Sequence, residues 1–464
     1  MIPMHATLRA RAFALVAVVA LVCSVAAVTA APADEGPAAE FDPGVPDEYD
    51  FSPTTEPGVA TVDGERFDSL DAALSSAAPG ETVILRGRFE ERVTVDTRGV
   101  TLRSTPGALA TIDGGGEGNV LTVTAPNVTV ERVWVRNSGF AASTNDAGVW
   151  INGTNATIRD ARVTAVTFGV WVNGVDGVTI RNTTIVGRES ITPRSERGNG
   201  IQLWRLDSAT VVGNRITDAR DGVYYSWASN VLARGNTLWD LRYGVHYMYS
   251  DDNRLVNNTA FGNDAGYALM LSKRLVVRGN VAYDNTGGSG HGILLKAIDD
   301  TTVAGNELVG NERGVYLYNS LDNRITGNLL LENEVGVRVA AGSTRATVRN
   351  NSFIGNDRHV RAVVAGRREW TGTGRGNYWS GARTVDRDGD GVGELRYRPV
   401  GAVEGLTARH PAARVFLASP AFDAVRTAER SIPLVESTGI VDRRPLVEPK
   451  HEDWRRYYAR DRTR

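Results

Sequence analysis

The sequence has few of the residues that would indicate disulfide bonds, disorder or a nucleic-acid partner. Its 464 residues include one cysteine and 17 prolines, and 52 lysines and arginines nearly balance 54 aspartates and glutamates. Near-neutral charge gives no electrostatic footprint for a phosphate backbone, so we expect no nucleic-acid partner. Hydrophobic residues make up 42% of the chain, too many for a disordered one. Glycine is the residue in excess, at 50 residues or about 11% against a typical ~7%.

The N-terminus predicts export. Arg9 and Arg11 precede an apolar run over residues 12–28, and small residues that suit a signal-peptidase site follow it. We therefore interpret residues 1–30 as a signal peptide. An uncleaved membrane anchor is the alternative, although the run is shorter than the ~20 residues of a spanning helix. Cys23 would leave with the signal peptide, so the exported chain would contain no thiol.

A short phrase that starts with glycine recurs along the chain, in most cases every 22 residues. Its first residues are Gly148, Gly169, Gly200, Gly222, Gly244, Gly266, Gly292, Gly314 and Gly336. The residues one and three positions after each glycine are apolar, which is the period of a strand with one buried face. A unit this short cannot bury its own face, so the units must stack on one another. The repeats therefore predict an all-β fold, a right-handed parallel β-helix.

Asparagine returns fourteen residues after the glycine in seven consecutive repeats. These residues are Asn214, Asn236, Asn258, Asn280, Asn306, Asn328 and Asn350. Stacked asparagines can hydrogen-bond from amide to amide along a coil, and asparagine tolerates the left-handed backbone of sharp turns. We expect the glycine before each strand to serve the bend in the same way.

Both ends of the repeat array carry signals for caps. Residues 68–80 combine a capping residue, apolar spacing and a Pro-Gly stop, which predicts a short helix over the N-terminal end. Ser419 and Pro420 predict the start of a second helix near the C-terminal end. The expected organisation is a signal peptide (1–30), a disordered leader (31–58), the β-helix (59–370), a C-terminal cap region with helical and irregular structure (371–449) and a tail of unassigned role (450–464).

The residues two and four positions after each glycine should form one outward face. None of them is aspartate or glutamate, although sugar-cleaving β-helices use carboxylates on such a face. Many are aromatic, which suits a partner protein or, as the alternative, the rings of a sugar. The candidate partner-binding residues are Trp171, Trp204, Tyr224, Tyr316 and Tyr318.

His246, Met248 and Met270 form a group of soft ligands on this face. The two methionines hold the same position in neighbouring repeats, so their strands should lie about 4.8 Å apart, with His246 two residues along. Thioether and imidazole groups without hard oxygen ligands suit Cu(I). The alternative is an apolar patch for a protein partner.

A second candidate metal site lies in the C-terminal region. Asp386, Asp388 and Asp390 hold the first, third and fifth positions of a loop with the spacing that opens a calcium site. Position twelve is Tyr397 rather than a bidentate glutamate, so the loop is not an EF-hand. A tight acidic turn, with or without one Ca²⁺, fits these residues.

Over residues 60–449 the chain resembles the NosD family of exported copper-site maturation proteins. Apart from the 22-residue repeats, the resemblance is carried by Phe67 to Gly80, Ile112-Asp-Gly-Gly-Gly116, Asn377-Tyr-Trp379, Asp388-Gly-Asp-Gly391, Tyr397-Arg-Pro399, Ser419-Pro-Ala421 and Pro445-Leu446. The ordered C-terminal phrases are the specific part, since many secreted β-helices share such repeats. No ligand residues are carried over from the family.

The resemblance implies a role rather than an enzyme activity. Such proteins work in the periplasm or at the outer face of the cytoplasmic membrane, on an ABC-type transporter, and help to assemble the copper-sulfide centre of nitrous oxide reductase. The partners implied are the transporter permease and ATPase, the reductase and a copper chaperone lipoprotein, with copper handled transiently. A secreted β-helix that binds or modifies polysaccharide is the alternative.

Overall fold

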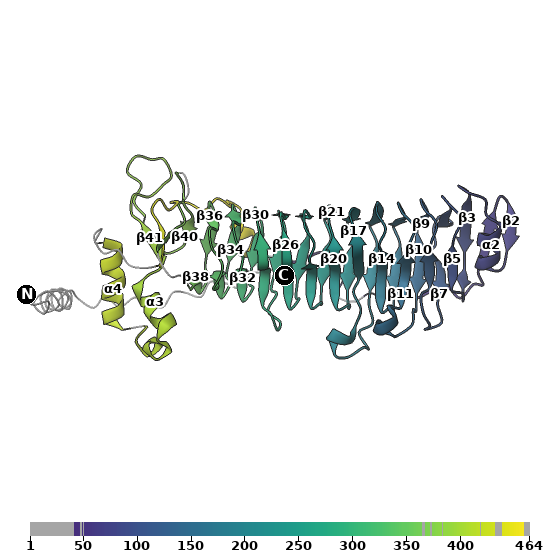
Figure 1. The fold of residues 1–464 in the computed structure, drawn as a ribbon, viewed down its shortest axis with the longest axis horizontal. Helices are drawn as coiled ribbons and strands as arrows, with labels where there is room; N and C mark the ends of the chain where they lie inside the picture. The colour runs from purple at the N-terminus through teal and green to yellow at the C-terminus, as the bar shows by residue number, and fades with distance from the viewer. Residues whose placement is uncertain are drawn as a thin grey trace, which may run out of the picture.

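The computed structural model describes residues 41–46, 49, 51–363, 367–371, 374–382, 384–417, 419–431 and 439–458. They form an elongated parallel β-helix in which three long sheets run along the coil (Figure 1). The predicted all-β, parallel β-helix architecture is confirmed. Its first strand begins at Val59, and its last lies at Tyr378–Trp379. No helix among the described residues is both long and apolar enough to cross a membrane.

Each turn of the coil contributes one strand to each long sheet. The 14-stranded sheet contains, in spatial order, β2 (Glu65–Phe67), β1 (Val59–Val62), β3 (Thr82–Arg86), β6 (Thr101–Ser104), β9 (Thr129–Glu131), β12 (Thr157–Arg159), β15 (Val178–Arg181), β18 (Ala209–Val212), β21 (Val231–Arg234), β24 (Arg254–Val256), β27 (Val276–Arg278), β30 (Thr302–Ala304), β33 (Arg324–Thr326) and β36 (Thr347–Arg349). The 13-stranded sheet contains β4 (Arg88–Phe89), β7 (Ala110–Asp113), β10 (Val133–Arg136), β13 (Arg162–Thr164), β16 (Thr184–Val186), β19 (Arg215–Thr217), β22 (Thr237–Trp239), β25 (Thr259–Phe261), β28 (Val281–Tyr283), β31 (Glu307–Val309), β34 (Leu329–Leu331), β37 (Ser352–Ile354) and β40 (Tyr378–Trp379). The 12-stranded sheet contains β5 (Val93–Val95), β8 (Leu121–Val123), β11 (Ala147–Ile151), β14 (Phe168–Asn173), β17 (Ile201–Leu206), β20 (Asp221–Ala228), β23 (Tyr243–Met248), β26 (Ala265–Lys273), β29 (His291–Asp299), β32 (Arg313–Tyr318), β35 (Val335–Val339) and β38 (Arg358–Ala362).

The core is a stack of equivalent apolar residues from successive turns. In the 12-stranded sheet, Val223 pairs with Val245, which pairs with Tyr267, and all three side chains are buried. The residues three positions after the glycine are buried in the same way, as at Tyr225, Tyr247 and Leu269. Each turn thus buries the apolar face of its neighbours, which is the stacking that the repeat period predicts.

The glycines that start the repeats have a different role from the one expected. They do not have positive φ values. A Cβ atom at Gly222 would lie 2.5 Å from the carbonyl oxygen of Gly244, and one at Gly244 would lie 2.6 Å from that of Gly266. Glycine is therefore required because the backbone of the next turn passes too close for any side chain. The left-handed bends belong to other residues, such as Gly213 and Gly235.

A buried asparagine ladder ties the turns together, as predicted. The side-chain nitrogen of Asn236 donates to Asn258 Oδ1 at 2.8 Å, and Asn258 donates to Asn280 at 2.9 Å. The prediction was wrong at Asn350. Asn328 donates to Asn351 instead, at 2.9 Å, because this turn is one residue longer and moves the inward position along the chain.

A short helix covers the N-terminal end of the coil, as predicted. Helix α2 (Leu70–Ser76) buries Leu70 and Leu74 against the first turns, and the Ser69 hydroxyl caps it by accepting from the Ala72 amide. The Glu91 carboxylate accepts from the amides of Leu70 and Asp71, each at 3.0 Å. The helix N-terminus is thus satisfied by a carboxylate from the coil itself.

The C-terminal cap combines helices with a small sheet. Its elements are α3 (Ala402–Arg409), η3 (Pro411–Phe416), α4 (Pro420–Ser431), and a three-stranded sheet of β39 (Arg367–Glu369), β42 (Gly439–Asp442) and β41 (Tyr397–Val400). Helix α4 begins where Ser419 and Pro420 predicted. The remaining short helices are η1 (Ala142–Thr144), η2 (Arg194–Glu196) and η4 (Trp454–Tyr458).

Asp442 joins this cap to the last turn of the coil. It accepts hydrogen bonds from the Asn377 amide at 2.7 Å and from the Trp379 indole at 2.9 Å. Asn377 also receives the last bond of the asparagine ladder, from Asn351 at 2.9 Å, and Trp379 stacks on Phe353 at 4.2 Å. The Asn377-Tyr-Trp379 phrase is therefore a structural closure of the β-helix.

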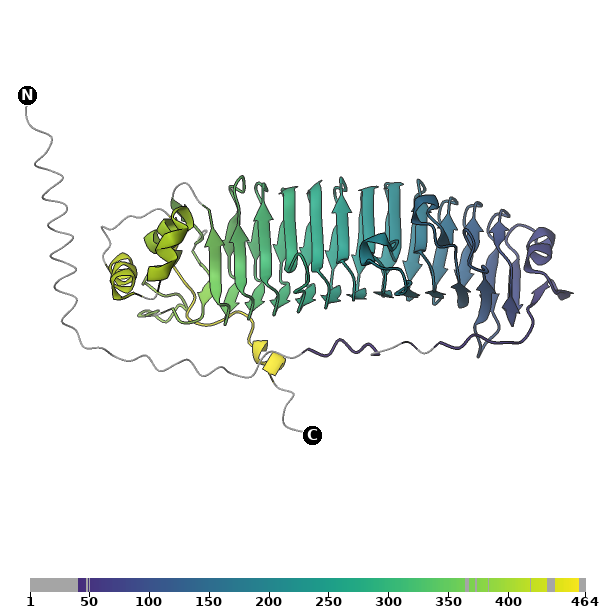
Figure 2. The same cartoon turned by 90° about the horizontal axis from the view of Figure 1, so that it is seen from below.

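The described part of the leader is not disordered, which corrects the sequence prediction for residues 31–58. It runs along one side of the coil towards the N-terminal cap (Figure 2). Phe41 packs on Tyr283 at 5.0 Å, and Tyr49 on Trp239 at 6.1 Å. The Arg162 guanidinium lies 3.6 Å from the centre of the Phe51 ring. The prediction of disorder rested on the proline and acid content of the leader. It did not consider that the aromatic residues of the leader could bind to the outer face of the 13-stranded sheet.

The tail, to which no role was assigned from the sequence, returns to the same outer face. Tyr457 is buried against Val309, Leu331 and Ile354, and its ring lies 6.3 Å from that of Phe41. Its hydroxyl donates to the Glu307 carboxylate, which also pairs with an arginine of the tail. Leader and tail thus meet over one apolar stripe and close it.

Candidate metal site and exposed face of the 12-stranded sheet

The two predicted thioether ligands are neighbours across two strands. Met248 of β23 lies opposite Met270 of β26 in register, and both are half-buried. Ser226 precedes them in the same row and Lys296 follows. The other two methionines of the chain, Met1 and Met4, precede the predicted signal-peptide core, so this pair holds all the thioether groups of residues 5–464.

His246 lies on the same strand, two residues before Met248. It is buried, with an exposed fraction of 7%, between the rings of Tyr224 at 4.7 Å and Tyr243 at 5.0 Å, each edge to face. Its Nδ1 atom lies 2.9 Å from Asp221 Oδ2. Its Nε2 atom is buried and has no hydrogen-bond partner among the described residues. Of the two ring nitrogens, Nε2 is the one left to bind a ligand.

Asp221 is in contact with both His246 and Arg242. It is fully buried and accepts two further hydrogen bonds from the Arg242 guanidinium, at 2.8 and 2.6 Å. Burial raises the pKa of Asp221, but the hydrogen bonds from His246 and Arg242 outweigh burial and leave it below its usual value. The contact with Asp221 occupies Nδ1 and orients the ring, so that Nε2 is the nitrogen left without a partner.

Asp221 corrects the inference that this face has no carboxylate. It immediately precedes Gly222, whereas the inference considered only the residues after each glycine. Its carboxylate lies beside the row of His246, because its Oδ2 atom is 2.9 Å from the Nδ1 atom of that histidine. The sequence does contain a pattern that could have revealed this position. Polar residues recur directly before the repeat glycines, at Asn199, Asp221, Tyr243, His291 and Arg313.

Two lateral loops border this part of the face. The loop that carries η2 reaches over the edge of the sheet, where Arg194 donates to the carbonyl oxygen of Leu241 at 3.2 Å. On the other side, the Ser289 hydroxyl lies 3.5 Å from the Tyr243 hydroxyl. The histidine and methionine residues thus lie between two loops on one side of the solenoid, where such proteins often carry function.

The predicted partner-binding aromatics differ in accessibility. Tyr318 is exposed, and Trp204, Tyr224 and Tyr316 are half-buried. Trp171 is buried, which contradicts its assignment to a partner surface. Its ring stacks on Trp150 at 5.2 Å and meets Phe168 at 4.8 Å, so its own neighbours cover it.

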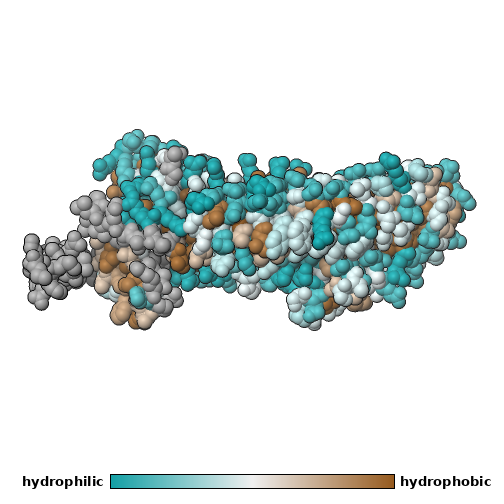
Figure 3. Space-filling view, viewed as in Figure 1, coloured by the Kyte–Doolittle hydropathy of each residue, from teal (hydrophilic) through white to brown (hydrophobic). Residues whose placement is uncertain are grey.

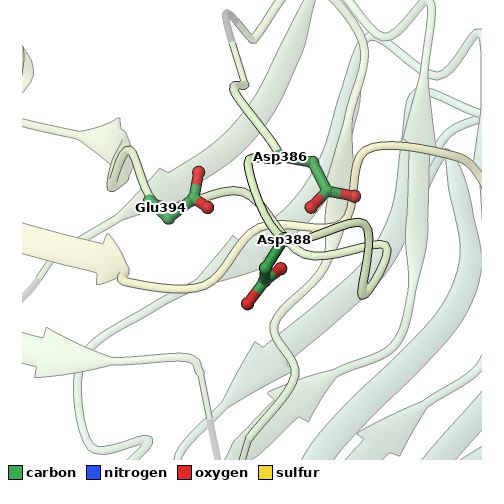
Figure 4. A group of neighbouring side chains, drawn as sticks. All are labelled: Asp386, Asp388 and Glu394. Atoms are coloured by element: carbon green, nitrogen blue, oxygen red, sulfur yellow. The ribbon is translucent and has the colours of Figure 1, made fainter.

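The acidic turn brings together a different set of carboxylates from the one expected. Oxygen atoms of Asp386, Asp388 and Glu394 lie within 4.8 Å of one another (Figure 4). Asp390 points elsewhere and pairs with Arg444 at 3.1 Å. Asp386 accepts from the amides of Gly389 and Gly391, so the turn closes through its own backbone. Calcium at Asp386, Asp388 and Asp390 stays a prediction, and the geometry replaces the last of these with Glu394.

The C-terminal cap carries an exposed apolar patch. We define it by Leu406, Val415, Phe416 and Val425, of which Val415 is 85% and Phe416 58% exposed. Figure 3 shows hydrophobic surface over this end of the molecule, around α3 and α4. Grouped apolar residues on a protein surface are typical of interaction sites.

Comparisons with known proteins agree with this architecture. Residues 181–383 match the family model described as periplasmic copper-binding protein (NosD). A protein of Pseudomonas aeruginosa named probable ABC transporter binding protein NosD is 36% identical over 403 residues, or 84% of this chain and 93% of the relative. A protein of the same name from Stutzerimonas stutzeri is 33% identical over 375 residues, covering 78% and 85%.

Solved structures with some likeness are more distant. A PL6 alginate lyase in complex with a trisaccharide is 15% identical, with a TM-score of 0.45, and the match covers 64% of this chain and 85% of that one. The Dettilon tailspike protein is 17% identical, with a TM-score of 0.46, and the match covers 61% of each chain. On the identity and coverage of the two curated relatives, the chain belongs to the NosD family.

Proposed function

We propose that this protein is an exported, non-enzymatic accessory protein that receives Cu(I) and passes it on during assembly of the copper-sulfide centre of nitrous oxide reductase, while bound to an ABC-type transporter. Its family is described as copper-binding and periplasmic, and its relatives are named for binding an ABC transporter. The observation that carries the copper step is the unpartnered Nε2 of His246, on the same strand face as the Met248 and Met270 pair.

The chemistry of this donor set suits Cu(I) as cargo. Thioether and neutral imidazole are soft or borderline ligands, and no thiolate is present beyond Cys23. Asp221 occupies Nδ1 and leaves Nε2 available, and Arg242 neutralises the charge of Asp221. Three uncharged donors bind Cu(I) less tightly than thiolates would, which favours transfer over storage.

The exposed apolar patch of the cap supports docking of that end to the transporter. Leu406, Val415, Phe416 and Val425 are uncovered by the described residues. In our proposal the cap therefore lies next to the membrane.

The polysaccharide-active alternative has less support. It needs carboxylates free to exchange protons with a sugar. Asp221 is the carboxylate closest to the candidate site, and it is fully buried and bonded to both His246 and Arg242.

A Cu(I) competition titration of the exported protein tests the copper step. We expect the double variant Met248→Leu/Met270→Leu, which preserves side-chain volume, to lose at least about tenfold in affinity, or ~1.4 kcal/mol. His246→Ala should weaken binding in the same direction. The matched control is Ile293→Leu, an apolar exchange in the core of the same sheet. Equal affinities for all four proteins would refute the assignment.

Docking of the cap requires its own experiment. We expect Val415→Asp/Phe416→Asp to abolish co-purification with the transporter permease and ATPase from membranes, while the purified variant keeps its Cu(I) affinity. Arg345→Ala, at an exposed ion pair of the coil, is the control. Retention of the double variant on the transporter would contradict the proposed orientation.

A further inference from the structure

A pocket of about 500 Å³ lies at the corner where the chain passes from the 12-stranded to the 14-stranded sheet. It is lined by Asp176, Arg205, Leu206, Asp207 and Trp227. These residues come from three successive turns of the coil, so the pocket crosses the stack. Its volume is within the range of sites that bind small molecules. None of its lining residues takes part in the candidate copper site, so the pocket is a separate feature of the molecule.

The row of side chains at this corner explains where the pocket opens. Gly174, Arg205 and Trp227 hold equivalent positions in successive turns, because the strands before them pair in register. Arg205 and Trp227 carry large side chains, whereas Gly174 has none. The missing side chain leaves room beside Arg205, and Asp176, two residues after Gly174, lines that space. The pocket therefore lies where the row of large side chains ends.

Trp227 gives the pocket an aromatic wall. Tyr249 of the following turn stacks on its ring, with the ring centres 5.3 Å apart and an angle of 11° between the planes. Trp204 meets the same ring edge to face at 5.4 Å. Trp227 is nevertheless 48% exposed, so these contacts hold the ring in place and leave much of it accessible. The pocket lies on the side of the preceding turns, which supply its other lining residues.

Arg205 brings hydrogen-bond donors to the pocket. Its guanidinium lies 5.2 Å from the centre of the Trp204 ring and 5.7 Å from that of Trp227. It forms no ion pair and no side-chain hydrogen bond with any residue that the structure describes. The aromatic rings thus orient the guanidinium without using its N–H groups.

Asp176 and Asp207 bring hydrogen-bond acceptors. Asp176 Oδ1 accepts from the Asp207 amide at 2.6 Å, and Asp207 Oδ1 accepts from the Ser229 hydroxyl at 2.8 Å. The Oδ2 atom of each carboxylate has no hydrogen-bond partner among the described residues, and neither carboxylate pairs with Arg205. Donors and acceptors therefore line the same pocket without satisfying one another.

This set of polar groups selects a neutral ligand with several hydroxyl groups. A guanidinium only donates hydrogen bonds and a carboxylate only accepts them, whereas a hydroxyl does both and pairs with either. An anion would be repelled by Asp176 and Asp207, and a cation would be repelled by Arg205. The aromatic wall beside these groups suits the apolar face of a pyranose ring. A sugar therefore matches the pocket better than a charged ligand does.

We propose that this pocket binds a pyranose unit of a neutral glycan. Trp227 packs against the apolar face of the sugar ring, Arg205 donates to its oxygen atoms, and the two carboxylates accept from its hydroxyl groups. The inference goes beyond the proposed function and does not depend on copper, because the two sites share no residue. Glycans belong to the surroundings of an exported protein, and this pocket attaches the protein to them.

Ligand-observed NMR titration with maltotetraose, cellotetraose and chitotetraose, which are neutral tetrasaccharides, tests the pocket. The exported protein should bind at least one of them in the millimolar range, because the pocket is open to solvent. We expect Trp227→Asn and Arg205→Asn each to lower the affinity at least about tenfold. Asparagine suits the left-handed backbone at both positions, where φ is 51°, so the melting temperature and the Cu(I) affinity of both variants should not fall.

Leu271→Asn is the matched control, because Leu271 has the same backbone conformation two turns further along and does not line the pocket. This variant should bind the tetrasaccharides with the affinity of the parent. A parent that binds none of the neutral tetrasaccharides, or pocket variants that both keep its affinity, would overturn the proposal. Tighter binding of an anionic galacturonate tetramer or a cationic glucosamine tetramer than of every neutral one would refute the class of ligand.

Discussion

The 13-stranded and 12-stranded sheets carry comparable apolar rows on their outer faces. The chain covers the row of the first sheet and leaves the row of the second partly exposed. On the 13-stranded sheet, the outward row that includes Trp239, Val309 and Leu331 is buried by the leader and the tail. On the 12-stranded sheet, Met248 and Met270 stay half-exposed beside the exposed Tyr249 and Leu271. Among the described residues, both terminal segments bind to the 13-stranded side. Apolar surface that stays exposed in this way is typical of interaction sites.

The two faces also differ in their polar groups. The tail contributes Tyr457 and Tyr458, whose hydroxyls donate to Glu307 and Glu332 on the covered face. The open face holds His246, whose Nε2 atom has no partner among the described residues. Buried polar atoms without a partner also occur on the covered side, at the hydroxyls of Tyr49 and Thr111, so the open face is distinguished by the type of the atom, a ring nitrogen that can bind a metal.

The largest expected effect comes from uncovering the closed face. Tyr457→Ala should cost about 3 to 5 kcal/mol of tail docking, because it removes a large ring from an apolar contact. The tail can detach without unfolding the coil, so the loss should appear as faster amide exchange in residues 450–458, by roughly 100-fold or more. Hydrogen-exchange mass spectrometry measures it. Tyr249→Ala on the open face should cost less than about 1 kcal/mol. Equal effects at the two tyrosines would remove the distinction between the faces.

A second, smaller effect concerns pH and the edge of the open face. Burial, together with the positive charges of Arg313 and Arg338, lowers the pKa of His291 to about 4, against 6.5 for a free histidine. The unfolded chain therefore takes up a proton at this residue before the folded protein does. Stability should fall as the pH decreases from about 6.5 to 4, by up to ~3 kcal/mol from this residue.

The variant His291→Leu tests this contribution through unfolding free energies measured between pH 7 and 4. We expect its stability to depend less steeply on pH than that of the parent. Burial also lowers the pKa values of His359 and His451, so the dependence should shrink without disappearing. A slope identical to that of the parent would contradict the effect.

The smallest expected effect is at Leu271, an exposed residue with a left-handed backbone beside the open face. Leu271→Asn relieves a left-handed backbone, a conformation that costs ordinary residues about 1–2 kcal/mol, and it loses little packing because the side chain is partly exposed. We expect an increase of about 0.5–1 kcal/mol in the free energy of unfolding. Chemical denaturation of this variant beside Leu269→Asn, at a buried position of the same strand, gives the comparison. A destabilised Leu271→Asn would argue against backbone strain at this position.

The repeat spacing was sufficient to predict which residues of the coil become neighbours. Successive repeats of equal length place equivalent residues in register, so the 22-residue interval between Met248 and Met270 already implied their pairing. The ladder prediction succeeded for the same reason and was wrong only at Asn350, where the interval changes. In a regularly stacked coil, the spacing of residues in the sequence therefore determines which of them are in contact.

The contact between His246 and Asp221 could not be predicted in the same way. It joins residues 25 positions apart, and it depends on side-chain rotamers that spacing does not determine. The return of the leader and tail was missed because their aromatic residues have no period. Phe41 and Tyr457 meet through tertiary packing, across more than 400 residues of sequence.

The most direct test of the copper site uses its two methionines. In the exported protein labelled with ¹³C at the methionine methyl groups, the two expected resonances can be assigned with the variants Met248→Leu and Met270→Leu. We expect one equivalent of Cu(I) to shift both resonances together and to perturb the imidazole signals of His246. Methyl resonances that stay at their copper-free positions, while Cu(I) remains with a competing chelator, would contradict the copper site on the open face.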